Sequence, residues 1–213
     1  PLVPVGDMPI LEIVLRQLAY RGFDRVTLAV NHLAELIMAF FRDGRELGLS
    51  ISYSREDKPL GTAGPLSLIR DLDDDFLVMN GDLLTTIDYG ALMKTHRKSG
   101  ATATIGVFTR TVEIDFGVVQ HRDKEFVAYE EKPTYSFDVS MGVYALSRSV
   151  VESIPHGAHM DMPTLMTTLS KQGEIVHCYS ERCDWLDIGR LDDHEAADQI
   201  FRERSADYLP PDH

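Results

Sequence analysis

The sequence is short of cysteine and has no long hydrophobic run. Its 213 residues include two cysteines, Cys178 and Cys183, whose spacing is neither a C-x-x-C pair nor part of a four-ligand set. This argues against a disulfide framework and against a structural zinc site, and it favours a reducing, cytoplasmic location. No run approaches the roughly 18 apolar residues of a membrane-spanning helix, and no signal peptide is visible. We therefore expect no association with a membrane.

Several common enzyme motifs are missing as well. The sequence has no G-x-G-x-x-G, no G-x-x-x-x-G-K-[ST] and no G-x-S-x-G. Dinucleotide oxidoreductases, P-loop enzymes and serine esterases therefore lose their main support.

Positive charge is also scarce. Lys and Arg number 21 against 34 Asp and Glu, which gives a formal net charge of −13. A field of this sign argues against a protein that binds nucleic acid or an anionic membrane through its overall charge. It does not argue against a small anion bound at a local site.

The patterns that are present predict an α/β fold. Hydrophobic residues make up 44% and charged residues 26%, as in a globular protein. Helical periodicity predicts helices over 9–21, 32–44, 64–72, 87–100, 149–154, 162–173 and 191–204, and apolar runs predict strands over 25–30, 50–54, 76–80, 101–109, 116–121, 126–133, 138–147 and 174–180. This alternation predicts a Rossmann-like mixed, mostly parallel sheet with helices on both faces, in a single domain over 1–213.

The beginning of the sequence departs from the usual order of such a fold. An open parallel sheet usually begins with a strand, a phosphate-binding turn and then a helix. Here a loop-like stretch leads directly into the helix predicted over 9–21. We therefore expect a central strand and its turn to precede residue 1 in a longer chain.

The segment PLGTAGPL, residues 59–66, places Gly61, Thr62 and Gly64 just before a predicted helix. Small residues let a backbone approach a planar or anionic ligand, and a helix N-terminus offers free N–H groups. The segment is equally compatible with a plain structural turn.

Two further segments each contain a carboxylate that could bind a ligand, Asp82 in one and Asp187 in the other. FLVMNGDLL (76–84) is an apolar strand that leads into Asn80, Gly81 and Asp82, and DWLDIGR (184–190) contains Asp187 beside the single tryptophan. Ligands of open α/β sheets bind beyond the carboxyl ends of the strands, and carboxylates there suit a hard divalent cation. A turn and a packed tryptophan corner are the alternative interpretations.

The segment YEEKP, residues 129–133, brings Glu131 and Lys132 to the end of a predicted strand. A lysine beside a glutamate can pair a phosphate with its ammonium while the carboxylate accepts from a hydroxyl. A surface charge cluster is the alternative.

The order of these segments is more specific than any one of them. The run PLVPVGDMPILE, VNHLAELI, EDKPLGTAGPL, FLVMNGDLL, FGVV, EEKP, SMGVYALS, DMPTLM and DWLDIGR resembles the sugar-1-phosphate nucleotidylyltransferases, from residue 1 to about residue 197. Within this family it looks most like short bacterial enzymes that make activated sugars for surface glycans. It is most similar to guanylyltransferases for mannose-, heptose- or amino-sugar-1-phosphates, with glucose-1-phosphate thymidylyltransferases close behind.

The resemblance implies a reaction and its partners. An NTP and a sugar-1-phosphate would give an NDP-sugar and pyrophosphate, with Mg²⁺ as cofactor, in the cytoplasm and in a possible homodimer. By the same resemblance Asp82 and Asp187 are catalytic residues that hold the metal. Lys132, also catalytic, would meet the sugar phosphate and Glu131 the sugar hydroxyls.

The resemblance also implies the remaining contacts. Gly117 and Gly142 would approach the sugar closely. Glu56 stands where the family reads the base edge, and its carboxylate can accept both N1–H and the 2-amino group of guanine, which favours GTP. The other nucleotide-binding positions are Gly61, Thr62, Gly64, Asn80 and Gly81.

Two alternatives stay open. A non-catalytic nucleotide-sugar sensor of the same fold would have lost its metal carboxylates, whereas a uridylyl-, thymidylyl- or cytidylyltransferase would differ in substrate. The family's glycine-rich loop, with its Arg and Lys, is expected before residue 1. An intact Arg and Lys there would favour the enzyme over the sensor.

Overall fold

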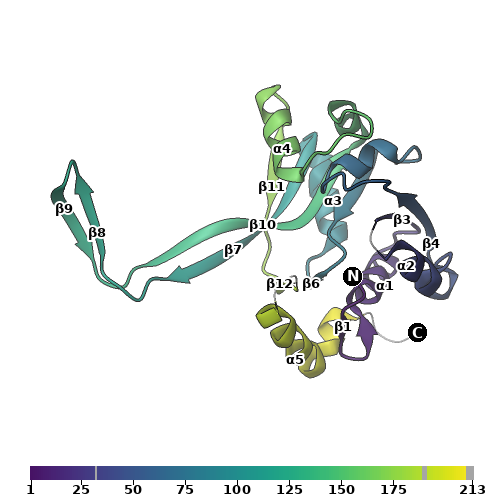
Figure 1. Cartoon of the computed structure of the whole chain (residues 1–213), viewed down its shortest axis with the longest axis horizontal. Coiled ribbons are helices and arrows are strands. Elements are labelled where there is room, and N and C mark those ends of the chain that lie inside the picture. Colours follow the sequence, from purple (N-terminus) through teal and green to yellow (C-terminus); the bar gives the residue numbers. More distant parts are fainter. Residues whose placement is uncertain (32, 189–190, 210–213) are drawn as a thin grey trace.

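The computed structural model describes residues 1–31, 33–188 and 191–209, which form a mixed α/β body with a long projecting arm (Figure 1). The helices are α1 (Ile10–Tyr20), α2 (Ala34–Phe41), α3 (Tyr89–Ser99), α4 (Met162–Lys171) and α5 (Leu191–Tyr208), with the short 3₁₀ helices η1 (Arg45–Leu47), η2 (Gly64–Leu68) and η3 (Arg148–Ser153). The strands are β1 (Pro4–Val5), β2 (Met8–Pro9), β3 (Arg25–Val30), β4 (Ser50–Arg55), β5 (Asp75–Met79), β6 (Leu83–Thr85), β7 (Ala103–Glu113), β8 (Val118–Arg122), β9 (Glu125–Glu130), β10 (Thr134–Ser147), β11 (Val176–Tyr179) and β12 (Trp185–Asp187).

Most predicted elements are present near their expected bounds, but two are of another type. The helices predicted over 64–72 and 149–154 are the 3₁₀ helices η2 and η3, and both end in an extended residue. Segments this short do not recover the cost of nucleating an α-helix from their own hydrogen bonds. Their helical spacing therefore produces only a tight turn.

The main sheet is mixed, as predicted, but it is not mostly parallel. Its strand order is β11-β7-β10-β5, and only β11 and β7 run parallel. Strand β10 is antiparallel to both β7 and β5. The chain passes from β7 to β10 through the β8–β9 hairpin without a crossover helix, so the two strands meet antiparallel. The pair β3 and β4 is parallel and separate.

Helices cover both faces of the main sheet. Along β10, Tyr144 and Leu146 pack in one cluster with residues of α4. Val143 and Ala145 belong to a second cluster, with residues of α3 and α1. Successive residues of a strand point to opposite faces, so this alternation places α4 on one face and α3 on the other.

Helix α1 ties the two ends of the chain together. Its residues Ile10 and Ile13 pack in one cluster with Phe201 of α5. Gln17, on the same helix, donates from Nε2 to the carbonyl oxygens of Thr85 at 2.9 Å and Tyr208 at 2.8 Å. Among the helices of the described ranges, none combines the length and the apolar character needed to cross a membrane.

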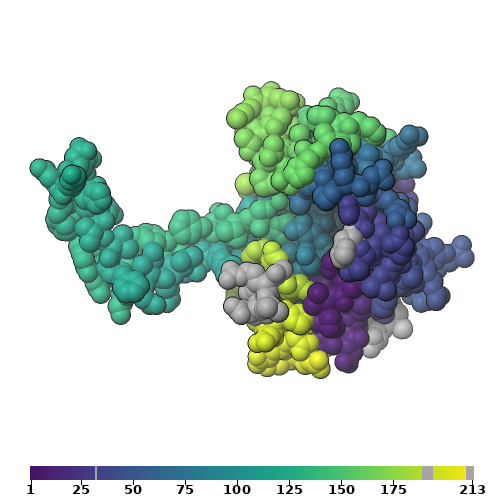
Figure 2. Space-filling view, viewed as in Figure 1, coloured from purple at the N-terminus to yellow at the C-terminus, as the bar shows by residue number. Residues whose placement is uncertain are grey.

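The arm consists of residues 109–138 and projects from the body (Figures 1 and 2). Strands β7 and β10 leave the main sheet as one antiparallel ladder that runs out to the pair Glu113–Thr134. The β8–β9 hairpin continues beyond it. The exposed large apolar side chains of the arm are Val112, Phe116, Val119, Phe126, Val127, Tyr129 and Phe137.

His96 is a buried polar residue of the core, with 1% of its surface exposed. Its Nδ1 lies 2.9 Å from Thr104 Oγ1, and its Nε2 lies 3.3 Å from Ser147 Oγ. Burial lowers the pKa of His96 below its ordinary value, against the opposing effect of the nearby Asp75 carboxylate. The folded protein therefore holds this ring neutral near neutral pH.

We expect the free energy of unfolding to fall as the pH drops below about 6.5, the ordinary pKa of histidine. The unfolded chain takes up a proton at His96 there while the folded chain does not, so acid favours unfolding. Urea titrations across this pH range measure the effect. His96→Gln is expected to reduce the pH dependence, whereas the control His121→Gln, at an exposed position of the arm, leaves it unchanged. Equal pH dependence in both variants and the wild type would contradict this.

Candidate functional site

A cleft of about 300 Å³ lies where β3, β5, the 60–64 loop and the start of α4 meet. It is lined by Ala29, Glu56, Gly61, Thr62, Pro65, Val78, Met79, Asn80, Tyr144, Met162 and Pro163. Four of the predicted nucleotide-binding residues are thus brought together in one cleft, although they come from distant parts of the sequence. This cleft is the candidate substrate site.

The loop over 60–64 packs closely on the segment before α4. Gly61 has a φ of +76°, and a Cβ there would lie 2.6 Å from Asp161 Oδ1. At Gly64 a Cβ would lie 2.5 Å from the Ala158 carbonyl oxygen. Only glycine fits this close approach of two backbones. The two glycines therefore allow the loop to pack closely against the segment before α4.

The expectation that this loop offers free N–H groups is not met. The N–H groups of Ala63 and Gly64 both donate to the carbonyl oxygen of Met160, at 2.9 and 3.0 Å. The N–H of Thr62 donates to Asp161 Oδ1 at 3.3 Å. These three donors are already used within the protein, so the small residues Gly61 and Thr62 line the cleft without offering the N–H groups of Thr62, Ala63 and Gly64 to a phosphate.

Polar side chains fix both ends of this loop. The Glu56 carboxylate accepts from the Leu60 N–H through Oε2 at 2.9 Å. Thr62 Oγ1 accepts from the Met162 N–H at 2.7 Å, which satisfies a free donor at the start of α4. A carboxylate has several acceptor sites, so Glu56 retains capacity for a ligand while it holds the loop.

Asn80 and Gly142 lie against each other across β5 and β10. The Asn80 N–H donates to the Gly142 carbonyl oxygen at 3.0 Å. Gly142 has a φ of +73°, at the register shift of β10, and a Cβ there would lie 2.7 Å from Asn80 Nδ2. Gly81 follows next to Leu11 and Pro1. The predicted nucleotide and sugar positions therefore adjoin at this end of β5.

Asp82 and Asp187 lie on neighbouring chain segments. Asp187 pairs with Leu83 in the β12–β6 ladder, and the Ile188 N–H donates to the Asp82 carbonyl oxygen at 3.3 Å. The backbones that carry the two predicted metal carboxylates are thus adjacent. Gly189 and Arg190 of the same motif lie outside the described residues.

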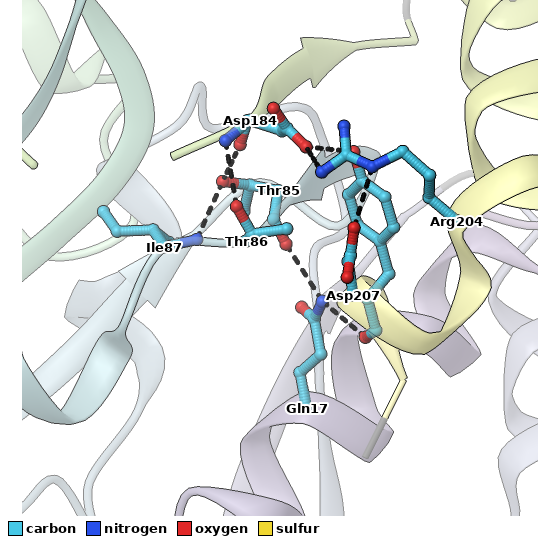
Figure 3. Close-up of polar contacts among 8 residues, drawn as sticks. Gln17, Thr85, Thr86, Ile87, Asp184, Arg204 and Asp207 are labelled. Atoms are coloured by element: carbon cyan, nitrogen blue, oxygen red, sulfur yellow. Dashed lines mark hydrogen bonds and ion pairs between the residues drawn. The ribbon is translucent and has the colours of Figure 1, made fainter. Parts of the chain in front are cut away.

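A polar network holds β12 beside β6 (Figure 3). Thr85 Oγ1 donates to the Asp184 carbonyl oxygen at 2.7 Å, and the Asp184 N–H donates to Thr86 Oγ1 at 2.9 Å. The Asp184 carboxylate pairs with Arg204 at 2.8 Å and accepts from Tyr208 Oη at 3.0 Å. Helix α5 therefore braces the strand pair that positions the two carboxylates.

The donor set suits a hard cation such as Mg²⁺. Within the described ranges, no group of three or more His, Cys, Asp and Glu residues is placed to hold a metal. Carboxylates on two adjacent chain segments are ligands of the type that Mg²⁺ takes, since it is bound through one or two carboxylates together with substrate phosphates. Asp82 and Asp187 are the residues that would hold it.

The predicted sugar-phosphate residues of the arm are not brought to the cleft. Glu131 and Lys132 are exposed between β9 and β10, and Gly117 lies against Tyr129 before β8. The β7–β10 ladder carries all three outward with the arm (Figure 1). Within one copy of the chain, the structure therefore separates Lys132 from the cleft.

Comparison with known protein families identifies the family of this chain. The model of the nucleotidyl transferase family matches residues 1–203. The chain belongs to the nucleotidyl transferase family. The family expected from the order of the motifs is thereby confirmed.

Curated relatives of this chain are sugar-1-phosphate nucleotidyltransferases. The chain is 34% identical to UTP–glucose-1-phosphate uridylyltransferase of Synechocystis sp., and the alignment covers 91% of this chain and 55% of that protein. It is 29% identical to mannose-1-phosphate guanylyltransferase of Mycobacterium tuberculosis, over 91% of this chain and 56% of that protein. The chain thus spans about half the length of these curated relatives.

Solved structures of the family share the fold. HddC from Yersinia pseudotuberculosis, complexed with GMP-PN, superimposes with a TM-score of 0.71 at 22% identity, over 94% of this chain and 89% of that chain. A putative glucose-1-phosphate thymidylyltransferase from Bacillus anthracis gives 0.75 at 20% identity, over 95% and 86%. At these identities the similarity shows the mixed α/β fold.

Some residues of the site had no assigned role in the sequence. Asp161 accepts a hydrogen bond from the Thr62 N–H and lies against Gly61, although its DMPTLM segment contributed only to the family resemblance, with no role for this residue. Tyr144 and Met162 also line the cleft. Both are side chains of the kind found in protein cores. Nothing in the sequence distinguishes them from residues that only pack in the core.

The contact between Gly142 and Asn80 can be tested with a matched pair of glycines. Gly142→Ala is expected to destabilise the fold more than Gly173→Ala, measured by urea unfolding. Both positions have positive φ, +73° and +87°, but a Cβ at Gly173 meets nothing within 4 Å. The difference between the two variants, about 1–3 kcal/mol for a forced contact, measures the close approach. Equal losses would show that Asn80 moves aside freely.

Proposed function

We propose that the chain transfers a nucleoside monophosphate from an NTP to a sugar-1-phosphate and releases pyrophosphate, with Mg²⁺ as cofactor. The observation that carries this proposal is the pair of adjacent chain segments bearing Asp82 and Asp187. Beside them, β5 leads through Asn80 into the cleft lined by Glu56, Gly61 and Thr62. Membership of the family supports the same reaction class.

In this reaction a phosphate oxygen of the sugar attacks the α-phosphorus of the nucleotide. A new P–O bond forms there, and the bond to the bridging oxygen of the β-phosphate breaks, so that pyrophosphate leaves with that electron pair. Bound Mg²⁺ supplies charge neutralisation between the two anionic reactants. Asp82 and Asp187 would hold it, while the 60–64 loop and Asn80 would orient the nucleotide, so the chain would act mainly by positioning.

Guanine is the base that we propose. Glu56 lines the cleft with a carboxylate already fixed by the Leu60 N–H. A carboxylate can accept from both N1–H and the 2-amino group of guanine, whereas uracil and thymine offer it a single N–H. The relatives include a uridylyltransferase and a guanylyltransferase, and a structural neighbour was solved with GMP-PN. UTP and dTTP are therefore the competing substrates.

A non-catalytic nucleotide-sugar sensor is the second candidate. Such a protein would use the cleft without the reaction and would not need the two metal carboxylates. The presence of Asp82, Asp187 and Lys132 favours the enzyme.

We expect Asp82→Asn and Asp187→Asn each to lower kcat by about 10²–10³, because a charge contact made in the transition state is lost. The measurement is Mg²⁺-dependent pyrophosphate release by the full-length protein, with panels of NTPs and sugar-1-phosphates. Asp71→Asn is the control, since Asp71 is exposed at the other end of β5. Unchanged rates in both site variants would remove the two carboxylates from the metal site. No turnover with any pair of substrates in the wild type would contradict the proposed function and favour the sensor.

The choice of base can be tested by Glu56→Gln. If the carboxylate accepts two N–H groups of guanine, the variant replaces one acceptor by a donor, and KM for GTP is expected to rise about 10–100-fold, as for the loss of a hydrogen bond to a charged group. The preference for GTP over UTP and dTTP, measured as the ratio of kcat/KM values, is expected to fall. Asp57→Asn, on the exposed neighbouring residue, is the control. A wild-type preference for UTP or dTTP would overturn the assignment to guanine.

A further inference from the structure

The loop over 60–64 is held against the segment before α4 by the backbone of Met160. The Met160 N–H donates to the Leu60 carbonyl oxygen at 2.9 Å. The Met160 carbonyl oxygen accepts from the N–H groups of Ala63 and Gly64 at 2.9 and 3.0 Å. These three bonds hold the loop on either side of its tip, where two side chains complete the contact.

The side chains at the tip exchange their capping roles. Asp161 stands at the N-cap of α4, with an extended backbone and a residue type that is preferred there. Its carboxylate nevertheless makes no cap hydrogen bond to α4. Thr62 Oγ1 accepts from the Met162 N–H at 2.7 Å instead, while Asp161 Oδ1 accepts from the Thr62 N–H at 3.3 Å. Each side chain thus satisfies a backbone donor of the other segment, and we call these two bonds the exchanged caps.

The proline at the second helical position explains why the Asp161 side chain can leave its own helix. An N-cap side chain normally accepts from the N–H of the second or third helical residue. The second residue of α4 is Pro163, which has no N–H. One of the two usual donors is therefore missing, and the loop offers Asp161 the Thr62 N–H in its place.

The exchanged caps lie in the wall of the cleft. Gly61, Thr62, Met162 and Pro163 all line it. A Cβ at Gly61 would lie 2.6 Å from Asp161 Oδ1, so this carboxylate packs against the backbone of the loop. Asp161 is not among the described residues that line the cleft. It therefore supports the wall without occupying the space that a ligand would fill.

The Glu56 carboxylate holds the same loop at a second point. Its Oε2 accepts from the Leu60 N–H at 2.9 Å. Two carboxylates thus bind loop N–H groups two residues apart, Glu56 at Leu60 and Asp161 at Thr62. A movement of the loop at Thr62 would displace Leu60 and with it the bond that fixes Glu56. The direction in which Glu56 presents its remaining acceptor sites to the cleft therefore depends on Asp161.

Apolar burial holds both segments in the fold without the exchanged caps. Ala63 and Met162 are 0% and 2% exposed and belong to one core cluster. Asp161 and Thr62, by contrast, are exposed. Loss of a capping bond is therefore expected to loosen the loop locally and to leave the rest of the protein folded.

We propose that Asp161 is a positioning residue for the nucleotide: through the exchanged caps it holds the 60–64 loop in the conformation that binds the NTP. The identity of the ligand in this inference rests on the proposed function. Asp161 acts through Thr62 and does not contact the nucleotide. A preformed wall relieves the ligand of the cost of ordering it. The residue therefore contributes to affinity for the NTP and not to binding of the metal or of the sugar phosphate.

The kinetics of Asp161→Ala in the full-length protein test this role. KM for GTP is expected to rise about tenfold, as for the loss of a hydrogen bond to a charged group. The kcat, KM for the sugar-1-phosphate and the Mg²⁺ concentration for half-maximal rate are expected to stay close to the wild-type values. Asp161→Asn keeps an acceptor oxygen and is expected to recover most of the affinity. Asp71→Ala, at an exposed position outside the cleft, is the control.

Two outcomes of these kinetics would overturn the proposal. One is an unchanged KM for GTP in Asp161→Ala, which would leave the residue a purely structural role. The other is a similar rise in KM for GTP and for the sugar-1-phosphate, because the exchanged caps adjoin only the nucleotide part of the site.

A double-mutant cycle tests whether the two bonds act as one unit. Thr62→Val keeps the shape of the side chain but removes the oxygen that accepts from Met162, whereas Thr62→Ser keeps that oxygen. KM for GTP is expected to rise in Thr62→Val and to stay near the wild-type value in Thr62→Ser. When Thr62→Val is combined with Asp161→Ala, the rise is expected to be smaller than the product of the two single rises. A rise equal to that product would show two independent bonds and would overturn the exchanged caps as one device.

Amide hydrogen exchange observes the loop without any turnover. In Asp161→Ala the N–H groups of Ala63 and Gly64 are expected to exchange faster, while that of Leu146 in β10 keeps its wild-type rate. Faster exchange at all three amides would indicate a general loss of stability and would contradict a local role.

A failure of the proposed function is distinguished by the wild type. If it binds GTP without turnover, the proposed reaction is rejected, and the dissociation constant for GTP, measured by calorimetry, replaces KM in the same comparison of variants. If the wild type prefers UTP or dTTP, that nucleotide takes the place of GTP. A wild type that binds none of the three would overturn the positioning role together with the proposed function.

Discussion

Strand β10 is the element on which the rest of this structure depends. Its 14 residues pair antiparallel with β5 on one side and β7 on the other. At Gly142 the register shifts and the backbone comes against Asn80, which fixes the end of β5 at the cleft. On the other side of the shift the same strand leaves the body as half of the arm. One strand therefore sets both the geometry of the cleft and the direction of the arm.

A second constraint is electrostatic. The chain carries a net charge of −13, and its cleft contains the Glu56 carboxylate. The substrates that we propose, a nucleotide and a sugar phosphate, would add further negative charge, so their binding would require cations close to the phosphates. The backbone pairing of β6 and β12, braced by the Asp184–Arg204 ion pair, holds Asp82 and Asp187 on adjacent segments (Figure 3). In the proposed function these two acidic residues would hold a cation, which would offset the charge of an anionic substrate that they would otherwise repel.

Local patterns predicted the parts of this fold that depend on neighbouring residues. The apolar run over 25–30 became β3 with the same bounds, and Asn80, Gly81 and Asp82 follow a strand as expected. Interactions between distant residues could not be predicted in this way. The N–H of Thr62 is taken by Asp161, 99 residues away, so no local signal reveals that the loop has lost this donor. Likewise, the apolar run over 101–109 predicted a strand, but not that the strand continues to Glu113 and that its outer part leaves the sheet.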